Sequence, residues 1–75
     1  MTRHDYLQGI DDLARYHDAA VAARDLDATV ACAEALVRHF ITHREYRPPF
    51  KEAAALIKAF LPTTAFINAC ATDRS

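Results

Sequence analysis

The sequence predicts an all-α protein, a small bundle of about four helices that forms a single domain over residues 1–75. An apolar content of 52% argues against a disordered chain. A single glycine among many alanines favours helices. Apolar residues recur every three or four positions, and no segment shows the two-residue alternation of a strand.

The first predicted helix runs from about Arg3 to Arg24. The residues that share its apolar face are Tyr6, Leu7, Ile10, Leu13, Ala14, His17, Ala20 and Val21. Glycine in a helix interior costs about 1 kcal/mol relative to alanine. A division at Gly9 into a short helix and a longer one is therefore an open alternative. We expect His17 to be partly buried, with one ring nitrogen hydrogen-bonded to a neighbour.

The second predicted helix starts in the turn formed by residues 24–28, with Asp27 as its N-cap. Its buried stripe comprises Val30, Ala33, Val37, Phe40 and Ile41. The helix is expected to end near residues 43–46, because Pro48 and Pro49 cannot both continue it.

The third predicted helix begins at Pro49, which suits a first turn, and ends before Pro62. Its apolar face comprises Phe50, Ala53, Leu56, Ile57, Phe60 and Leu61. Either Thr63 or Thr64 caps a last short helix. That helix carries Phe66, Ile67 and Cys70.

A chain of 75 residues has a small core, and scaffolds of this size often depend on disulfides, a metal or oligomerisation. Cys32 and Cys70 are too few for a disulfide-dense secreted scaffold, and we expect two reduced thiols. No signal peptide is recognisable, and no apolar run reaches the roughly 20 residues that a membrane helix needs. We therefore expect a soluble cytoplasmic protein without a membrane partner, either monomeric or homodimeric.

The net charge of −1 conceals a separation of charges along the chain. Seven acidic and three basic residues precede position 38, whereas six basic and three acidic residues occupy positions 38–75. Arg38 and Arg44 suit the C-terminal end of a helix, where the macrodipole favours cations, but Arg47 and Lys51 lie beyond that end. The separation indicates a charged partner or head-to-tail self-association, with an ordinary solvated surface as the alternative.

Metal-binding and catalytic patterns are weak in this sequence. His39 and His43 lie four residues apart on one helix face, but Cys32 lies about 16 Å from His43 along a straight helix. One tetrahedral ion cannot bind all three, so a metal would need ligands from a second helix, and we predict no metal site. Gly9 is the only glycine, which excludes a glycine-rich phosphate loop. We predict that the protein is not an enzyme and has no cofactor or small-molecule substrate.

Two runs resemble the ends of proteins of the haemolysin-expression-modulating family (Hha/YmoA). They are TRHDYL at residues 2–7 and FLPTTAFI at residues 60–67. Family members open with a Thr-Lys-x-Asp-Tyr-Leu-like run and close with an Ile-Pro-Ser-Ser-x-x-x-Phe-like run, at a similar separation. The resemblance implies a small, four-helix bacterial protein of the cytoplasmic nucleoid that modulates transcription.

Proteins of this family bind the dimerisation region of the histone-like nucleoid-structuring protein and contact DNA weakly through basic residues while attached to it. Here the resemblance implies that an acidic group binds the partner and a basic group meets phosphate. These groups are Asp11, Asp12 and Asp18, and Arg38, Arg44, Arg47 and Lys51. The alternatives are a homodimeric DNA-binding protein that uses the basic patch, and a helical protein-interaction module without nucleic-acid binding.

Overall fold

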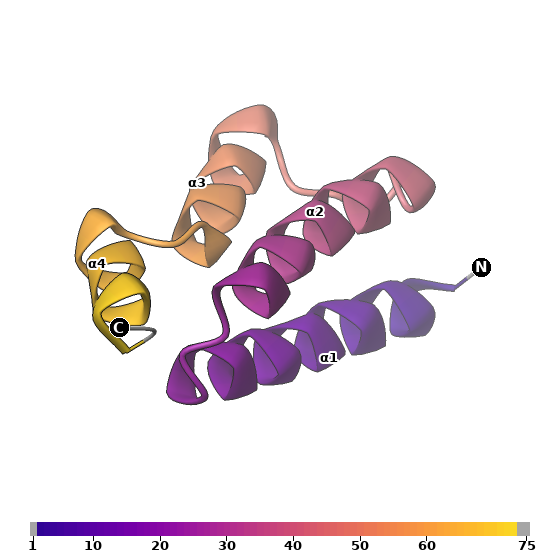
Figure 1. Ribbon diagram of the computed structural model, residues 1–75. Helices are drawn as coiled ribbons and strands as arrows, with labels where there is room; N and C mark the ends of the chain where they lie inside the picture. Colours follow the sequence, from indigo (N-terminus) through magenta and orange to yellow (C-terminus); the bar gives the residue numbers. More distant parts are fainter. Residues whose placement is uncertain (1, 74–75) are drawn as a thin grey trace.

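The computed structural model describes residues 2–73, which form helices and no strand (Figure 1). In chain order the helices are α1 (Arg3–Ala22), α2 (Leu26–Thr42), α3 (Phe50–Phe60) and α4 (Thr64–Asp73). The predicted all-α class is confirmed.

The helices lie in an elongated, thin arrangement. α1 and α2 form an antiparallel pair, and α3 packs on α2 (Figure 1). α4 lies near the turn between α1 and α2, where Cys70 Sγ donates a hydrogen bond to the carbonyl oxygen of Arg24 at 3.3 Å. The Cα atoms extend over 45 × 21 × 13 Å. The smallest extent is close to the diameter of one helix, about 10–12 Å, so few side chains are covered from both sides.

A capping box starts α1. The backbone nitrogen of Asp5 donates to Thr2 Oγ1, and the backbone nitrogen of Thr2 donates to Asp5 Oδ2, both at 3.2 Å. The hydrogen bond from the Thr2 backbone lowers the pKa of the Asp5 carboxyl group. α1 continues without interruption through Gly9, which excludes a divided first segment.

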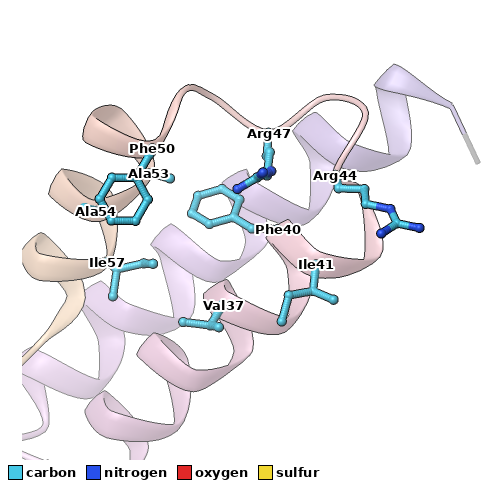
Figure 2. Close-up of a pocket in the computed structure, with 9 residues that line it drawn as sticks. All are labelled: Val37, Phe40, Ile41, Arg44, Arg47, Phe50, Ala53, Ala54 and Ile57. Carbon is cyan, nitrogen blue, oxygen red and sulfur yellow. The ribbon is translucent and has the colours of Figure 1, made fainter.

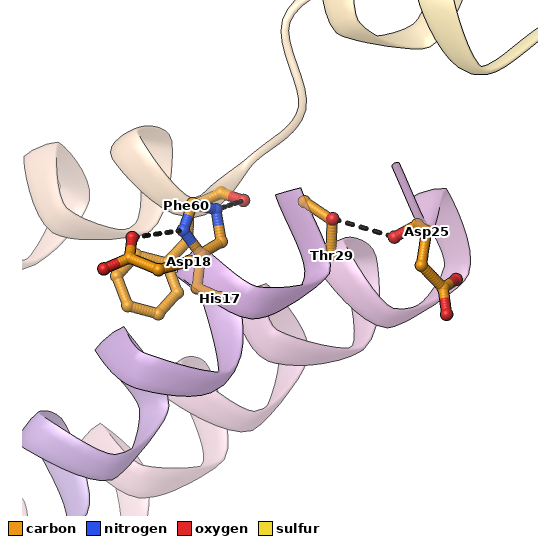
Figure 3. Close-up of polar contacts among 5 residues, drawn as sticks. All are labelled: His17, Asp18, Asp25, Thr29 and Phe60. Atoms are coloured by element: carbon orange, nitrogen blue, oxygen red, sulfur yellow. Dashed lines mark hydrogen bonds and ion pairs between the residues drawn. The ribbon is translucent and has the colours of Figure 1, made fainter. Parts of the chain in front are cut away.

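The N-cap of α2 is Asp25, and the prediction of Asp27 is wrong. Asp25 Oδ1 accepts a hydrogen bond from the backbone of Ala28 at 3.1 Å. Thr29 Oγ1 donates to the carbonyl oxygen of Asp25 at 2.9 Å (Figure 3). Arg24 adopts a left-handed φ of 53°, which ends the preceding turn and brings Asp25 into the cap position. Asp27 lies in the first turn of α2, where the macrodipole also favours a carboxylate.

The other helix boundaries follow the proline and threonine signals. α2 is followed by His43 as C-cap, close to the predicted end. Pro49 is the N-cap of α3, one position before the first turn in which it was expected. Thr63 Oγ1 accepts from the backbone nitrogen of Phe66 at 3.1 Å, which identifies Thr63 as the cap of α4.

The hydrophobic core is small and lies where α1, α2 and α3 meet. Its buried members are Tyr6, Leu36, Phe40 and Ala53. The prediction of a fully buried stripe on α2 is wrong for Val30, Val37 and Ile41, which are exposed. Apolar side chains are also exposed on the predicted faces of the other helices, at Leu7, Val21, Phe50, Leu56 and Leu61. The helices form a thin layer, and the described part of the chain contains no further element that covers these side chains.

His17 joins α1 to the last turn of α3. Its Nε2 donates to the carbonyl oxygen of Phe60 at 3.1 Å, and the two rings stack with centroids 4.6 Å apart (Figure 3). A carbonyl oxygen can only accept, so Nε2 carries the proton in this contact. The predicted role of His17 as a partly buried, hydrogen-bonded histidine is confirmed.

The segment Phe50–Thr72, 23 residues long, is long and apolar enough to cross a membrane by length and composition only, and an 18-residue window within it has a mean hydropathy of 1.4. The expectation that no segment meets this criterion is wrong, because a mean hydropathy tolerates isolated polar residues such as Lys58 and Thr63, which interrupt the apolar run. In the structure the segment is divided at residues 61–63 into α3 and α4.

Candidate interaction site at the junction of α2 and α3

A groove of about 380 Å³ opens between α2 and α3 (Figure 2). Its lining consists of Val37, Phe40, Ile41, Arg44, Arg47, Phe50, Ala53, Ala54 and Ile57. Ile41 and Phe50 are 68% and 80% exposed. Figure 2 shows Arg47 turned toward the ring of Phe40, whereas Arg44 points away from the groove. The site is therefore an apolar surface with two arginines at its rim.

Three of the four predicted nucleic-acid-binding residues lie together at this junction. Arg44 and Arg47 occupy the connection after α2, and Lys51 lies in the first turn of α3. Arg38 lies further back on α2, rotated by about 100° from Val37, because an α-helix has 3.6 residues per turn. None of these four cations forms an ion pair with another residue of the 2–73 range.

Helix stabilisation accounts for only part of this cationic group. Arg44 lies at the C-terminal end of α2, where the macrodipole favours positive charge. Lys51 lies at the N-terminal end of α3, where the same effect disfavours it. The position of Lys51 thus has no explanation in the stability of α3.

The predicted partner-binding aspartates are distributed over two sides of α1. Asp11 and Asp18 are seven residues apart and share a side, whereas Asp12 is rotated from Asp11 by about 100°. Each aspartate has a neighbour within its own helix. Asp11 pairs with Arg15 at 2.8 Å, and Asp12 accepts a hydrogen bond from Gln8 at 3.0 Å. Asp18 Oδ1 lies 4.0 Å from Nδ1 of His17 (Figure 3).

Four aromatic and imidazole rings gather beside the core: Tyr6, His39, His43 and Tyr46. Tyr6 and His39 stack with centroids 5.3 Å apart and an interplanar angle of 12°. Nε2 of His39 donates to the carbonyl oxygen of Tyr6 at 2.9 Å. Burial raises the pKa of the Tyr6 phenol. The contacts of Tyr6 and His39 hold α1 against α2.

The two histidines of this group lack a third side chain with which to hold a metal ion, within residues 2–73. The rings of His39 and His43 have centroids 4.4 Å apart. However, residues 2–73 contain no group of three histidine, cysteine or acidic side chains arranged to hold a metal ion. His43 Nδ1 is buried and has no hydrogen-bond partner among these residues.

Cys32 and Cys70 are both free thiols, 9% and 3% exposed. Burial raises the pKa of the Cys32 thiol, which lowers its thiolate fraction at a given pH. Neither cysteine has the exposed, electropositive surroundings of a reactive nucleophile.

We expect iodoacetamide to modify both cysteines slowly in the folded protein, because modification requires local opening. The rate at pH 8 should be at least about tenfold below the rate in urea, which corresponds to about 1.4 kcal/mol of opening free energy. Intact-mass spectrometry over time measures both rates. Equal rates in buffer and in urea would contradict the buried positions.

Sequence reasoning missed the groove because it assigned Val37 and Ile41 to the core. The sequence did contain a signal, namely the wide angle around α2 over which the residues of the predicted buried stripe are spread. Val30 and Ile41 lie far around the helix from the buried Leu36, so one neighbouring helix cannot cover both sides.

Fold and site together define a small all-α protein with an apolar groove and a basic rim. Comparisons with models of known families, with characterised proteins and with solved structures find no match to this chain. Residues that carry the resemblance to the haemolysin-expression-modulating family have local roles here. Thr2 and Asp5 form the capping box, Tyr6 lies in the core, and Thr63 caps α4.

Proposed function

We propose that this chain is a non-enzymatic regulator that joins a nucleoprotein complex and contacts phosphates through the cations near the α2–α3 junction. The sequence resemblance suggests which complex this is, namely a histone-like nucleoid-structuring protein on DNA. In such an arrangement the protein partner supplies most of the affinity, and the basic residues add contacts to the nucleic acid.

One observation carries this proposal: Arg38, Arg44, Arg47 and Lys51 are exposed and have no ion pair within residues 2–73. Such cations can displace counterions from phosphates without first breaking a contact inside the protein. The net charge is −1, whereas strong autonomous DNA-binding domains carry a clear positive excess. Cations that form no ion pair within residues 2–73, on a chain with a net charge of −1, therefore favour weak contact with phosphates, made while the chain is bound to a protein partner.

The exposed aspartates of α1 support the protein-binding half of the proposal. Asp11, which pairs with Arg15, and Asp18 present two carboxylates on one side of α1, distant in sequence from the cations of residues 38–51. A basic partner surface would complement this side, and such complementarity steers association and fixes orientation.

Removing three of the cations is expected to weaken DNA binding. The variant Arg38→Ala/Arg47→Ala/Lys51→Ala should lose at least about tenfold in affinity for a labelled duplex at low salt. Its plot of log affinity against log salt concentration should be shallower by up to about 2.7, because each phosphate contact contributes about 0.9. Fluorescence anisotropy over a salt series measures both quantities.

The matched control removes three cations from other parts of the chain, as Arg3→Ala/Arg15→Ala/Lys58→Ala. It changes the net charge equally and should retain most of the affinity and salt dependence. An equal loss in both variants would show that only net charge matters. Absence of duplex binding by the unmodified chain at low salt would contradict direct phosphate contact.

A second candidate function is a helical protein-interaction module without nucleic-acid binding. It is favoured by the apolar groove, because the exposed apolar side chains of Ile41 and Phe50 can contact a protein partner but contribute nothing to phosphate binding. A chain that binds no duplex, alone or with a nucleoid-structuring protein, would support this candidate over the regulator.

A further inference from the structure

The chain exposes more surface than a folded monomer of its size. Its accessible surface is 5445 Å². A monomeric protein of 8.4 kDa is expected to expose about 4,600 Å². The excess, roughly 800 Å², matches the area that each partner buries in a stable protein–protein interface. The uncovered surface is therefore large enough for one interface.

A continuous part of this excess surface lies along one side of α2 and at the start of α3. Val30, Val37 and Ile41 are 36%, 37% and 68% exposed, and Phe50 is 80% exposed. Val37, Ile41 and Phe50 line the groove. Val30 precedes Val37 by seven residues, so it extends the same side toward the start of α2. We call Val30, Val37 and Ile41 the apolar stripe of α2.

Two opposite charges accompany this stripe. Glu34 lies within its span, and Arg44 lies at the rim of the groove. Neither forms an ion pair with any residue between positions 2 and 73. Glu34 and Arg44 are each five residues from position 39, the midpoint between Val37 and Ile41.

We propose that a second copy of this chain covers the stripe and the groove, and that the two copies form an antiparallel homodimer. Its two-fold axis crosses the exposed side of α2 between Val37 and Ile41, at the level of position 39 along the helix. This symmetry places Val37 against the partner's Ile41, and Glu34 against the partner's Arg44. Each contact occurs twice, and such an interface closes after two copies. The exposed Phe50 reaches toward the partner's apolar stripe.

The charge pattern favours a second copy over other occupants. Glu34 repels the phosphates of nucleic acids and of anionic lipid headgroups, whereas it complements Arg44 of the second copy. The inference goes beyond the proposed regulatory function and does not depend on it. In the dimer Arg38 and Lys51, which do not line the groove, stay available to phosphates, whereas Arg44 and Arg47 lie at the covered groove.

Sedimentation velocity over a range of protein concentrations tests the dimer. The unmodified chain should form dimers, and Ile41→Asp should raise the dimer dissociation constant at least about tenfold by burying a carboxylate in an apolar contact. Tyr16→Asp is the matched control, because Tyr16 lies on α1 and is 67% exposed against 68% for Ile41. It should dimerise like the unmodified chain. Circular dichroism confirms that each variant is folded.

Charge reversal provides a second, independent readout. Glu34→Arg and Arg44→Glu should each weaken the dimer at least about tenfold, because both create like-charge contacts across the axis. The double variant Glu34→Arg/Arg44→Glu should recover most of the loss, because it restores opposite charges. Both positions are exposed, so the fold of the monomer should persist.

Several outcomes would overturn the inference. A monomer at every concentration, equal behaviour of Ile41→Asp and Tyr16→Asp, or no recovery in the double variant would each exclude this dimer. Binding of the monomer to vesicles with anionic headgroups, lost on Ile41→Asp, would assign the stripe to a lipid surface instead. A dimer that persists in the Arg38→Ala/Arg47→Ala/Lys51→Ala variant while duplex affinity falls would separate dimerisation from DNA contact.

Discussion

Replacing Gly9 by alanine is expected to destabilise this protein, although alanine is the better helix former. A Cβ atom at Gly9 would overlap the imidazole of His39. That ring stacks on Tyr6 and donates to its carbonyl oxygen, so it cannot move without losing both contacts. Overpacking costs about 1–3 kcal/mol, against a propensity gain of about 1 kcal/mol. Thermal unfolding at fixed protein concentration should show a lower Tm. Each kcal/mol lost from the free energy of unfolding lowers the Tm by about 4–8 °C.

The control is the same substitution in a chain without the obstructing ring. In the His39→Ala background, Gly9→Ala should be neutral or stabilising by up to about 1 kcal/mol, because the helix gains a better residue and the clash is absent. Destabilisation by Gly9→Ala is thus expected only in the chain that retains the His39 ring. A stabilisation of equal size in both would show that Gly9 does not set the distance between α1 and α2.

Replacing Leu36 by alanine should remove much of the remaining stability. Leu36 is 1% exposed and packs in the core with Tyr6, Phe40 and Ala53. Truncation of a buried leucine costs about 2–5 kcal/mol, and small domains have about 5–15 kcal/mol in total. Urea unfolding followed by circular dichroism measures the loss in free energy of unfolding.

Leu56 provides a matched leucine for this measurement. It lies on α3, is 40% exposed and does not line the groove. Leu56→Ala should cost less than about 1 kcal/mol, because much of its side chain already contacts water. Similar losses in free energy of unfolding at both positions would contradict the burial of Leu36 in the core.

Local signals in the chain predicted the helices well. Pro48, Pro49 and Pro62 interrupt helices by fixing φ and removing a donor, and these effects act wherever the rest of the chain lies. The predicted contact type of His17 was also correct, although its partner, the carbonyl oxygen of Phe60, depends on how α3 returns to α1. Asp25 and Asp27 offered equivalent cap chemistry, and the backbone conformation at Arg24 decided between them.

The candidate site was only partly predictable. The cluster of Arg44, Arg47 and Lys51 was visible because these residues are close in sequence and flank two prolines. The groove was not visible, because hydrophobic spacing identifies an apolar side of a helix without showing whether another element covers it. Ile41 and Phe40 are adjacent in sequence and equally apolar in pattern, yet only Phe40 is buried.

The sequence by itself determined that this chain forms helices, where prolines interrupt them, and that its cations gather near residues 38–51. Only the tertiary structure decided which apolar side chains are buried, why a glycine is needed at position 9 and which charges form no ion pair within residues 2–73. The physical reason is that helix formation and capping depend on neighbours within about four residues. Burial and ion pairing depend on distances between elements that spacing alone does not fix.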